Sequence, residues 1–371
     1  MGIMGLNVKQ LASLVTESPF FLYNMAHDKL KGARYNKYPR CITLYLTERC
    51  NFKCPMCHVK DSRAEKGKDL DFTLVEKVIK ESKRYTPCIQ FLGGEPTLYE
   101  PIIDAIKLVK RNGMLTTMTT NGLLLQRHAE GIVDSGLNFL SVSLDGWDEE
   151  SQKKRGNVAG SFNKIIDGIK YLIKYRGRRV FPILKISTIV TKNNFEHLEN
   201  IVELTKGLGI TRWALYHYAF VTQEASEQNS EFYKKTGIGE FMLGDNIGET
   251  PYFSPYEVNI IDYNLKKIFT EVATQDVYIE YNYDKGLDLK SYYSFKKPGS
   301  SSWCTHPFTD IDIRGNGDLT ICMGGYKLGN VAEDSIKAVW NGPKMEHFRQ
   351  YFDKHKTLPM CFRCCALNIS F

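Results

Sequence analysis

The chain has 371 residues, with 49 Lys and Arg against 42 Asp and Glu, and a formal net charge of +7. Hydrophobic residues make up 43% and charged residues 25%, which excludes a disordered or low-complexity chain. No apolar run is long enough to cross a membrane, the N-terminus lacks a signal-peptide pattern, and the scattered Lys and Arg form no nucleic-acid patch. We therefore expect a cytoplasmic protein that binds neither membranes nor nucleic acid.

After an N-terminal extension (residues 1–40), short apolar runs alternate with amphipathic helical stretches over residues 41–218. The six runs expected as strands are residues 42–47, 88–92, 115–120, 139–144, 184–190 and 211–216. The runs are almost continuously apolar, as strands covered on both faces are. The alternation predicts an α/β fold with a parallel sheet, although periodicity alone does not separate six such units from a closed barrel of eight.

Two of the helical stretches carry signals for their ends. Thr73 and Glu76 have the spacing of a capping box, which predicts that Thr73 caps the first helix of this region. Gly113 follows the apolar stripe of residues 102–109 and predicts the end of that helix.

The chain changes character after residue 218. Residues 219–302 are rich in aromatic side chains, and we expect a bridging or lid region, with a cluster of aromatics packed on the barrel flank as the alternative. Residues 303–371 are expected to form a small separate module. In it, residues 310–313 and 318–323 predict a hairpin around a Gly-Asn-Gly turn, and residues 335–352 predict one helical stretch.

Clustered thiols in a chain without an export signal usually bind metal. Six of the ten cysteines fall into two tight groups: Cys50, Cys54 and Cys57, and Cys361, Cys364 and Cys365. The other cysteines include Cys41 and Cys88, which border predicted strands and are expected to be core residues.

The first group is spaced CxxxCxxC and follows the first predicted strand directly. Three thiolates in one loop can hold a [4Fe–4S] cluster and leave one iron open to an exogenous ligand. A closed zinc site with His58 as fourth ligand is the alternative. After the second strand comes Gly-Gly-Glu-Pro (residues 93–96), where two glycines allow close backbone approach and the carboxylate suits an ammonium group. Both loops lie at the strand ends where ligands of such sheets bind.

With these two motifs, residues 41–218 resemble the radical SAM superfamily. The resemblance implies a partial (β/α)6 TIM-type barrel and a [4Fe–4S] cluster whose open iron binds S-adenosylmethionine (SAM). It further implies that SAM is reductively cleaved to a 5′-deoxyadenosyl radical, which abstracts a hydrogen atom from the substrate. A reducing partner such as flavodoxin or ferredoxin would supply the electron.

The resemblance also implies roles by position. The cluster ligands would be Cys50, Cys54 and Cys57. The SAM contacts would be Gly93, Gly94 and Glu95 with the ammonium group, Ser143 with the ribose, Arg155 with the carboxylate, and Asn121 as a further contact. Met56 stands where an aromatic residue commonly packs on the adenine, and its thioether can pack on the ring edge.

The C-terminal cysteines give a second resemblance, to the auxiliary-cluster module called twitch, a shorter relative of the SPASM module. It implies a second [4Fe–4S] cluster held by Cys304, Cys322, Cys361 and Cys364, with a four-cysteine zinc site as the alternative. Cys365 could be a spare ligand, a buried thiol or a hydrogen-atom donor to a substrate radical. The cysteine spacing resembles that of 2-deoxy-scyllo-inosamine dehydrogenases.

These resemblances imply the oxidation or epimerisation of a small polar, sugar- or aminocyclitol-like substrate, for which a tyrosine-rich pocket is suited. Modification of a ribosomally made peptide is the alternative. It is weakened because the roughly 40 residues before the first strand are too few for a leader-binding domain. A non-catalytic iron–sulfur or zinc-binding protein is a second alternative, which would leave the Gly-Gly-Glu motif and Arg155 unexplained.

Overall fold

The computed structural model describes residues 5–18, 36–57, 67–156, 158–236, 247–248, 252–272, 276–281, 288–294, 304–322 and 326–355, and the single residues 358, 361 and 364. Within these residues, no helix combines the length and the apolar character needed to span a membrane.

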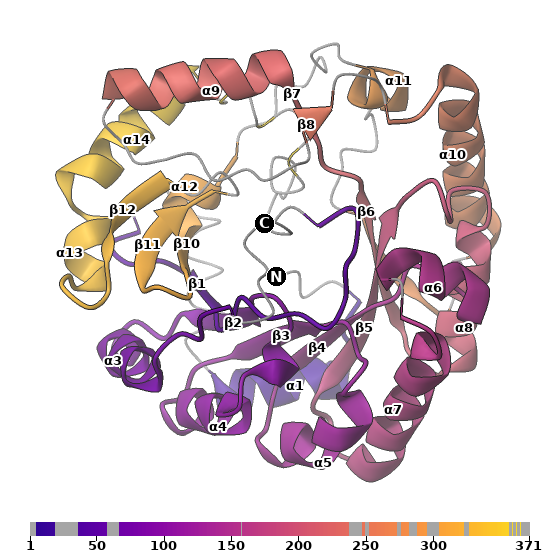
Figure 1. The fold of residues 1–371 in the computed structure, drawn as a ribbon. Helices are drawn as coiled ribbons and strands as arrows, with labels where there is room; N and C mark the ends of the chain where they lie inside the picture. Colours follow the sequence, from indigo (N-terminus) through magenta and orange to yellow (C-terminus); the bar gives the residue numbers. More distant parts are fainter. Residues whose placement is uncertain are drawn as a thin grey trace.

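In the described part of the chain, ten strands form one curved sheet in the order β12-β11-β10-β1-β2-β3-β4-β5-β6-β9 (Figure 1). Its centre consists of β1 (Cys41–Tyr45), β2 (Cys88–Leu92), β3 (Thr116–Thr120), β4 (Phe139–Ser143), β5 (Ile183–Val190) and β6 (Arg212–His217). Each of these strands pairs in parallel with the next. The predicted six-strand partial barrel is therefore confirmed.

Helices cover the outer face of the barrel sheet (Figure 1). They are α3 (Phe72–Ser82), α4 (Ile102–Arg111), α5 (Leu125–Asp134), α6 (Glu149–Gly156), α7 (Ser161–Arg176) and α8 (Leu198–Gly207). Ile42 and Leu44 of β1 are fully buried in one apolar cluster with Val75 of α3. Because side chains alternate along a strand, Thr43 and Tyr45 project from the other, inner face. The inner face of this barrel carries polar as well as apolar side chains. In a closed barrel of eight units, branched apolar side chains fill the interior instead.

The sheet continues beyond both edges of the predicted barrel. The strand β9 (Tyr278–Tyr281) pairs in parallel with β6, and β10 (Asp310–Ile313) pairs in parallel with β1. Two antiparallel strands follow β10, namely β11 (Asp318–Ile321) and β12 (Tyr326–Asn330). The predicted C-terminal hairpin is confirmed as far as Ile321, but its place beside β1 was not predicted.

Two helix predictions are wrong and one is confirmed. The cap of α3 is Asp71, whose carboxylate accepts the Thr73 backbone N–H at 2.8 Å, so the predicted capping box does not form. The single helix predicted over residues 335–352 is split into α13 (Ile336–Trp340) and α14 (Pro343–His355), since Pro343 favours the first turn of a new helix. Gly113, with φ of +70°, does follow the end of α4.

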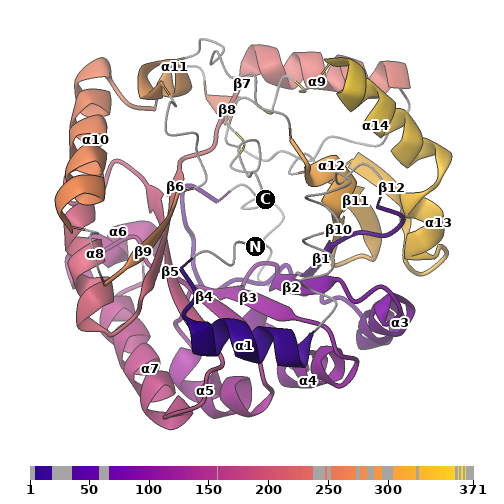
Figure 2. The ribbon, with the colours of Figure 1, turned by 180° about the vertical axis from the view of Figure 1, so that it is seen from behind.

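The remaining elements lie around the open side and ends of the barrel (Figures 1 and 2). They are α1 (Val8–Glu17), β7 (Val221–Thr222), α9 (Gln223–Thr236), β8 (Ile247–Gly248), α10 (Pro255–Lys267), the π-helical turn η3 (Ile268–Val272), α11 (Leu289–Tyr293) and α12 (His306–Thr309). In Figure 2, α1 crosses the N-terminal ends of the barrel strands. Asn138, just before β4, donates to the Glu17 carboxylate of α1 at 2.7 Å and ties the two together.

Candidate functional site

Three thiols lie in the loop that follows β1, and we call Cys50, Cys54 and Cys57 the barrel thiols. The loop is fastened to the end of α6, because the Lys53 N–H donates to the Gly156 carbonyl at 3.3 Å. Burial raises the pKa of Cys54, the Arg155 guanidinium opposes this effect, and the other two thiols add to it. The three thiols are therefore close enough to interact with one another, with a cation beside them.

Gly93 and Gly94 pack directly on the backbone that leads into this loop. A Cβ atom on Gly93, whose φ is +136°, would lie 2.5 Å from the Thr47 carbonyl oxygen. A Cβ atom on Gly94 would lie 2.1 Å from the Arg49 carbonyl oxygen. These contacts are closer than any side chain allows, so both positions require glycine. Here the partner that approaches the two glycines is the protein's own backbone, and their predicted contact with a ligand stays a prediction.

The Glu95 carboxylate is buried and hydrogen-bonded within the protein. One oxygen accepts the Thr97 hydroxyl and the Thr120 hydroxyl, both at 2.6 Å, and the Thr97 N–H at 3.1 Å. The other oxygen accepts the Asn121 N–H at 2.7 Å. The side chain is 1% exposed and caps the short helix η2 (Pro96–Leu98). In this arrangement Glu95 joins the loops after β2 and β3.

Asn121 extends the same connection to the barrel thiols. Its side-chain amide donates to the Asn51 side-chain oxygen at 2.7 Å, and Asn51 follows Cys50. Its own oxygen accepts the Leu123 N–H at 3.0 Å. The loops after β1, β2 and β3 are thus held in one hydrogen-bonded chain.

Two further predicted site residues lie nearby in different settings. Met56 is 7% exposed and belongs to the main apolar cluster. Ser143 ends β4, and its carbonyl oxygen accepts an N–H of Arg155 at 3.0 Å. His58, the alternative zinc ligand, lies outside the described residues.

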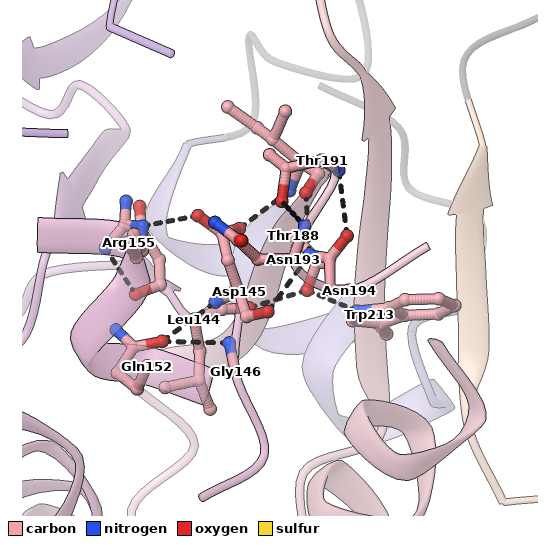
Figure 3. A network of polar contacts seen from close by, with 12 residues as sticks. Leu144, Asp145, Gly146, Gln152, Arg155, Thr188, Thr191, Asn193, Asn194 and Trp213 are labelled. Carbon is pink, nitrogen blue, oxygen red and sulfur yellow. Dashed lines mark hydrogen bonds and ion pairs between the residues drawn. The ribbon is translucent and has the colours of Figure 1, made fainter. Parts of the chain in front are cut away.

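Arg155 of α6 is buried in an ion pair with Asp145, which follows β4 (Figure 3). Its guanidinium also lies over the Phe52 ring, 5.7 Å from the centroid. Burial would lower the pKa of Arg155, but Asp145 and the thiols of Cys54 and Cys50 raise it above its usual value. The guanidinium therefore stays charged beside the barrel thiols.

Asp145 is the centre of a polar network that the sequence did not reveal (Figure 3). Its second carboxylate oxygen accepts the Ile189 N–H at 2.8 Å, and its carbonyl accepts the Asn194 side chain at 3.0 Å. The Gln152 side-chain oxygen accepts the N–H groups of Asp145 and Gly146. The sequence signal that could have indicated Asp145 is its position in Ser-Leu-Asp-Gly, at the end of a predicted strand. Its partners are too distant in sequence to be inferred from spacing.

A second missed group is the buried imidazole of His217 at the end of β6. Its two ring nitrogens lie 2.6 Å from the Tyr293 hydroxyl and 2.7 Å from the Tyr281 hydroxyl. Burial lowers the pKa of His217 to about 3, so the ring is neutral and donates through one nitrogen while it accepts through the other. This cluster brings part of the aromatic-rich region onto the end of the barrel.

The second set of thiols lies beside β10 and β11, and we call Cys304, Cys322, Cys361 and Cys364 the C-terminal thiols. Burial raises the pKa of Cys304 to about 12, with a further contribution from Cys364. Burial also raises the pKa of Cys322 well above its usual value, and the other three C-terminal thiols add to this effect. Cys322 has a φ of +62°, a conformation uncommon outside glycine and frequent at functional sites. The structure thus brings the four predicted thiols together, and Cys365 lies outside the described residues.

Across the described ranges, no three His, Cys, Asp or Glu side chains converge as closely as ligands of a single metal ion do.

Comparison with protein families matches two stretches of the chain. Residues 44–205 match the radical SAM superfamily, and residues 304–365 match an iron-sulfur cluster-binding domain named SPASM. The first stretch contains the barrel thiols, and the second contains the C-terminal thiols.

The curated relatives fall into two kinds. A probable GTP 3′,8-cyclase of Saccharolobus islandicus is 32% identical over 181 residues, which is 48% of this chain and 56% of that protein. A tungsten-containing aldehyde ferredoxin oxidoreductase cofactor-modifying protein of Pyrococcus furiosus is 24% identical over 352 residues, or 86% of each chain. This chain spans only about half the length of the cyclases it matches.

Solved structures share the fold over most of the chain. SuiB of Streptococcus suis has a TM-score of 0.62 at 18% identity and covers 92% of this chain and 76% of its own. The protein anSMEcpe with bound AdoMet has a TM-score of 0.59 at 17% identity, with coverage of 83% and 82%. SuiB is also known with S-adenosylmethionine and with the precursor peptide SuiA, and anSMEcpe with peptides. At these identities the likeness establishes the fold alone.

Proposed function

We propose that this protein is a maturase that abstracts a hydrogen atom from a peptide, since residues 44–205 match the radical SAM superfamily and residues 304–365 match an iron-sulfur cluster-binding domain named SPASM. The two domains imply three cofactors, namely a [4Fe–4S] cluster, an auxiliary iron–sulfur cluster and SAM. The presence of both domains in one chain is the observation that carries the proposal.

The donor groups at the barrel mouth fit the first cluster and SAM. The barrel thiols supply three ligands from one loop, which leaves one position for an exogenous ligand. The backbone carbonyls of Gly93 and Gly94 and the Glu95 carboxylate are our candidates for the ammonium group. Because the Glu95 carboxylate also accepts four protein donors, we assign it the further role of holding this backbone in place.

Arg155 is suited to the SAM carboxylate. A guanidinium has five N–H donors, and Arg155 directs one to Asp145 and one to the Ser143 carbonyl. The other N–H groups can bind a second carboxylate in the paired geometry that arginine favours. Ser143 and Met56 remain our candidates for the ribose and the adenine, and Asn121 for a further contact.

When bound, the first cluster and SAM supply a carbon-centred radical that removes a hydrogen atom from the substrate. The protein must keep water and other hydrogen donors away from that atom, and the aromatic side chains at the barrel end are suited to this task. The C-terminal thiols are our candidates for the auxiliary cluster, which would accept an electron from the substrate. Cys365 remains a candidate hydrogen-atom donor to the substrate radical. A flavodoxin or ferredoxin remains the candidate reductant of the first cluster.

One finding favours a peptide over the small polar substrate expected from the sequence. SuiB and anSMEcpe, whose fold this chain shares over most of its length, are both known with bound peptides. The Pyrococcus furiosus relative, which matches over 86% of both chains, is named as a cofactor-modifying protein, and that name does not favour a peptide. The cyclases match less than half of this chain and do not favour GTP as substrate.

Oxidation or epimerisation of a small polar molecule is the second candidate. It is favoured by hydrogen-bonding side chains on the inner face of the barrel, among them Thr43, Gln90 and Ser141. The resemblance to 2-deoxy-scyllo-inosamine dehydrogenases stays a prediction.

Deuterium transfer tests the substrate class. The protein is reconstituted anaerobically, reduced with dithionite and given SAM with deuterated peptides encoded beside its gene, or with deuterated sugars and cyclitols. We expect deuterium in 5′-deoxyadenosine from a peptide alone. Deuterium from a cyclitol or sugar would support the second candidate, and no SAM cleavage under any condition would contradict radical chemistry altogether.

A further inference from the structure

Cys41 and Cys88 form a thiol pair at the N-terminal end of the barrel. Each is the first residue of its strand, and the two lie directly opposite each other in the parallel register of β1 and β2. Paired residues of parallel strands project from the same face of the sheet. Their neighbours Ile42 and Ile89 are fully buried under the helices, so the two thiols face the inside of the barrel.

Both side chains are partly exposed, and neither belongs to the apolar core. The prediction that they are core residues is therefore wrong, and the reason is the alternation of side chains along the strand. The barrel thiols follow the opposite end of β1. Five residues at about 3.3 Å each separate the two sites by more than about 13 Å. Cys41 and Cys88 are thus separate from the barrel thiols, whereas Cys322 follows β11, one strand beyond Asp310.

The geometry of the pair is compatible with a disulfide bond. Neighbouring strands lie about 4.8 Å apart, which is within the usual Cα separation of disulfide-bonded cysteines, about 4.4–6.8 Å, and the bond would need the two Cβ atoms to approach to about 3.5–4.5 Å. On its other side, Cys41 is paired with Asp310 of β10, a carboxylate that disfavours a thiolate at Cys41.

The two thiols are not equivalent, because Cys41 lies directly opposite Asp310 and Cys88 lies one strand further away. The hydrogen bond with Cys88, burial and the Asp310 carboxylate all raise the pKa of Cys41. The hydrogen bond from Cys41 lowers the pKa of Cys88 and the Lys110 ammonium adds to this effect, while burial and Asp310 oppose it. A thiolate stabilised by a neighbouring thiol is the attacking partner of redox-active cysteine pairs.

We propose that Cys41 and Cys88 are a redox-active dithiol that reacts with low-molecular-weight disulfides, with Cys88 as the attacking and Cys41 as the resolving thiol. The Cys88 thiolate attacks one sulfur of the small disulfide, forms a mixed disulfide and releases one small thiolate. Cys41 then loses its proton, attacks the Cys88 sulfur and displaces the second small thiolate. The protein pair is oxidised by two electrons, and one small disulfide becomes two thiols.

Peptide mapping tests the proposal without any use of SAM. The cluster-loaded protein is incubated anaerobically with oxidised glutathione, its remaining thiols are alkylated, and it is digested with trypsin. Cleavage after Arg40, Arg49, Arg84 and Lys107 gives peptides 41–49 and 85–107, each with a single cysteine. We expect these two peptides to be disulfide-linked in most of the protein. Recovery of both peptides fully alkylated would overturn the proposal.

Single variants test the two roles. In Cys41→Ser, the mixed disulfide on Cys88 has no resolving thiol, so we expect a glutathione adduct on peptide 85–107. In Cys88→Ser, we expect about tenfold less adduct on peptide 41–49. Equal adducts in the two variants would overturn the assignment of roles. If a variant fails to fold, the linkage in the unaltered protein still decides the proposal.

Discussion

The barrel thiols and the C-terminal thiols differ in the charges that surround them. At Cys54, the Arg155 guanidinium opposes the effect of burial on the thiol pKa, while the Asp145 carboxylate and the other two barrel thiols add to it. At Cys322, the contributions beyond burial come from three other thiols and the Asp312 carboxylate, and all of them raise the thiol pKa. Three thiols beside a cation suit a site that binds a further ligand with a carboxylate. Four thiols, of which Cys304 and Cys361 are buried, suit a closed site that only gains and loses electrons.

The largest effect is expected from a change in the barrel thiols. In Cys54→Ala we expect no SAM cleavage, since the first cluster loses a ligand, and a loss of about four of about eight irons per chain. Iron analysis and chromatography of 5′-deoxyadenosine measure both. Full SAM cleavage by this variant would contradict the assignment.

The matched change in the C-terminal thiols is Cys361→Ala. We expect a similar loss of iron, because one ligand of the second cluster is removed, but continued SAM cleavage without product formation. The ratio of 5′-deoxyadenosine to modified substrate measures this uncoupling. If SAM cleavage stops as it does in Cys54→Ala, the two thiol sets do not have the separate roles proposed here.

A smaller effect is expected at the cation that distinguishes the two sets. Arg155→Lys keeps the charge but loses the planar pair of donors, and we expect the Kd for SAM to rise about tenfold, or about 1.4 kcal/mol. Calorimetric titration of SAM into the reconstituted protein measures the change. Arg179→Lys is the control, since Arg179 is exposed and pairs with Asp134 on the outer surface. If the unaltered protein, Arg155→Lys and Arg179→Lys all bind SAM with the same Kd, Arg155 is not the partner of the SAM carboxylate.

The smallest effect is expected from the charge beside the C-terminal thiols. Removal of the Asp312 charge in Asp312→Asn should make the second cluster easier to reduce, and its potential should rise by roughly 30–60 mV. Redox titration followed by electron paramagnetic resonance measures both potentials in one sample. The reduction potential of the first cluster should not change. A change in that potential alone would mean that Asp312 acts on the barrel thiols and not on the C-terminal thiols.

Much of the barrel could be predicted because its signals are local. The thiol spacing and the Gly-Gly-Glu-Pro turn each occupy a few consecutive residues, and strand alternation places both at one end of the sheet. The strand β9 was missed because four residues, Tyr278–Tyr281, carry no alternation that can be recognised. The cap of α3 was assigned to Thr73 because the spacing fits, although Asp71 offers the stronger acceptor.

The details of the site could not be predicted, since they depend on pairs far apart in the chain. Glu95 was expected to face a ligand because it is acidic and follows two glycines. Its carboxylate also accepts donors from Thr120 and Asn121, which only the folded sheet brings near. The pairing of Arg155 with Asp145 is another such contact, because it needs the turn of α6 back toward β4.

The parallel pairing of β10 with β1 has a consequence for electron transfer. β10, which lies between Cys304 and Cys322 in the chain, is joined by a backbone ladder to β1, the strand that leads to the barrel thiols. Interior strands of a sheet are among the last parts of a protein to open. The ladder would therefore hold constant the separation on which electron tunnelling between the two thiol sets depends.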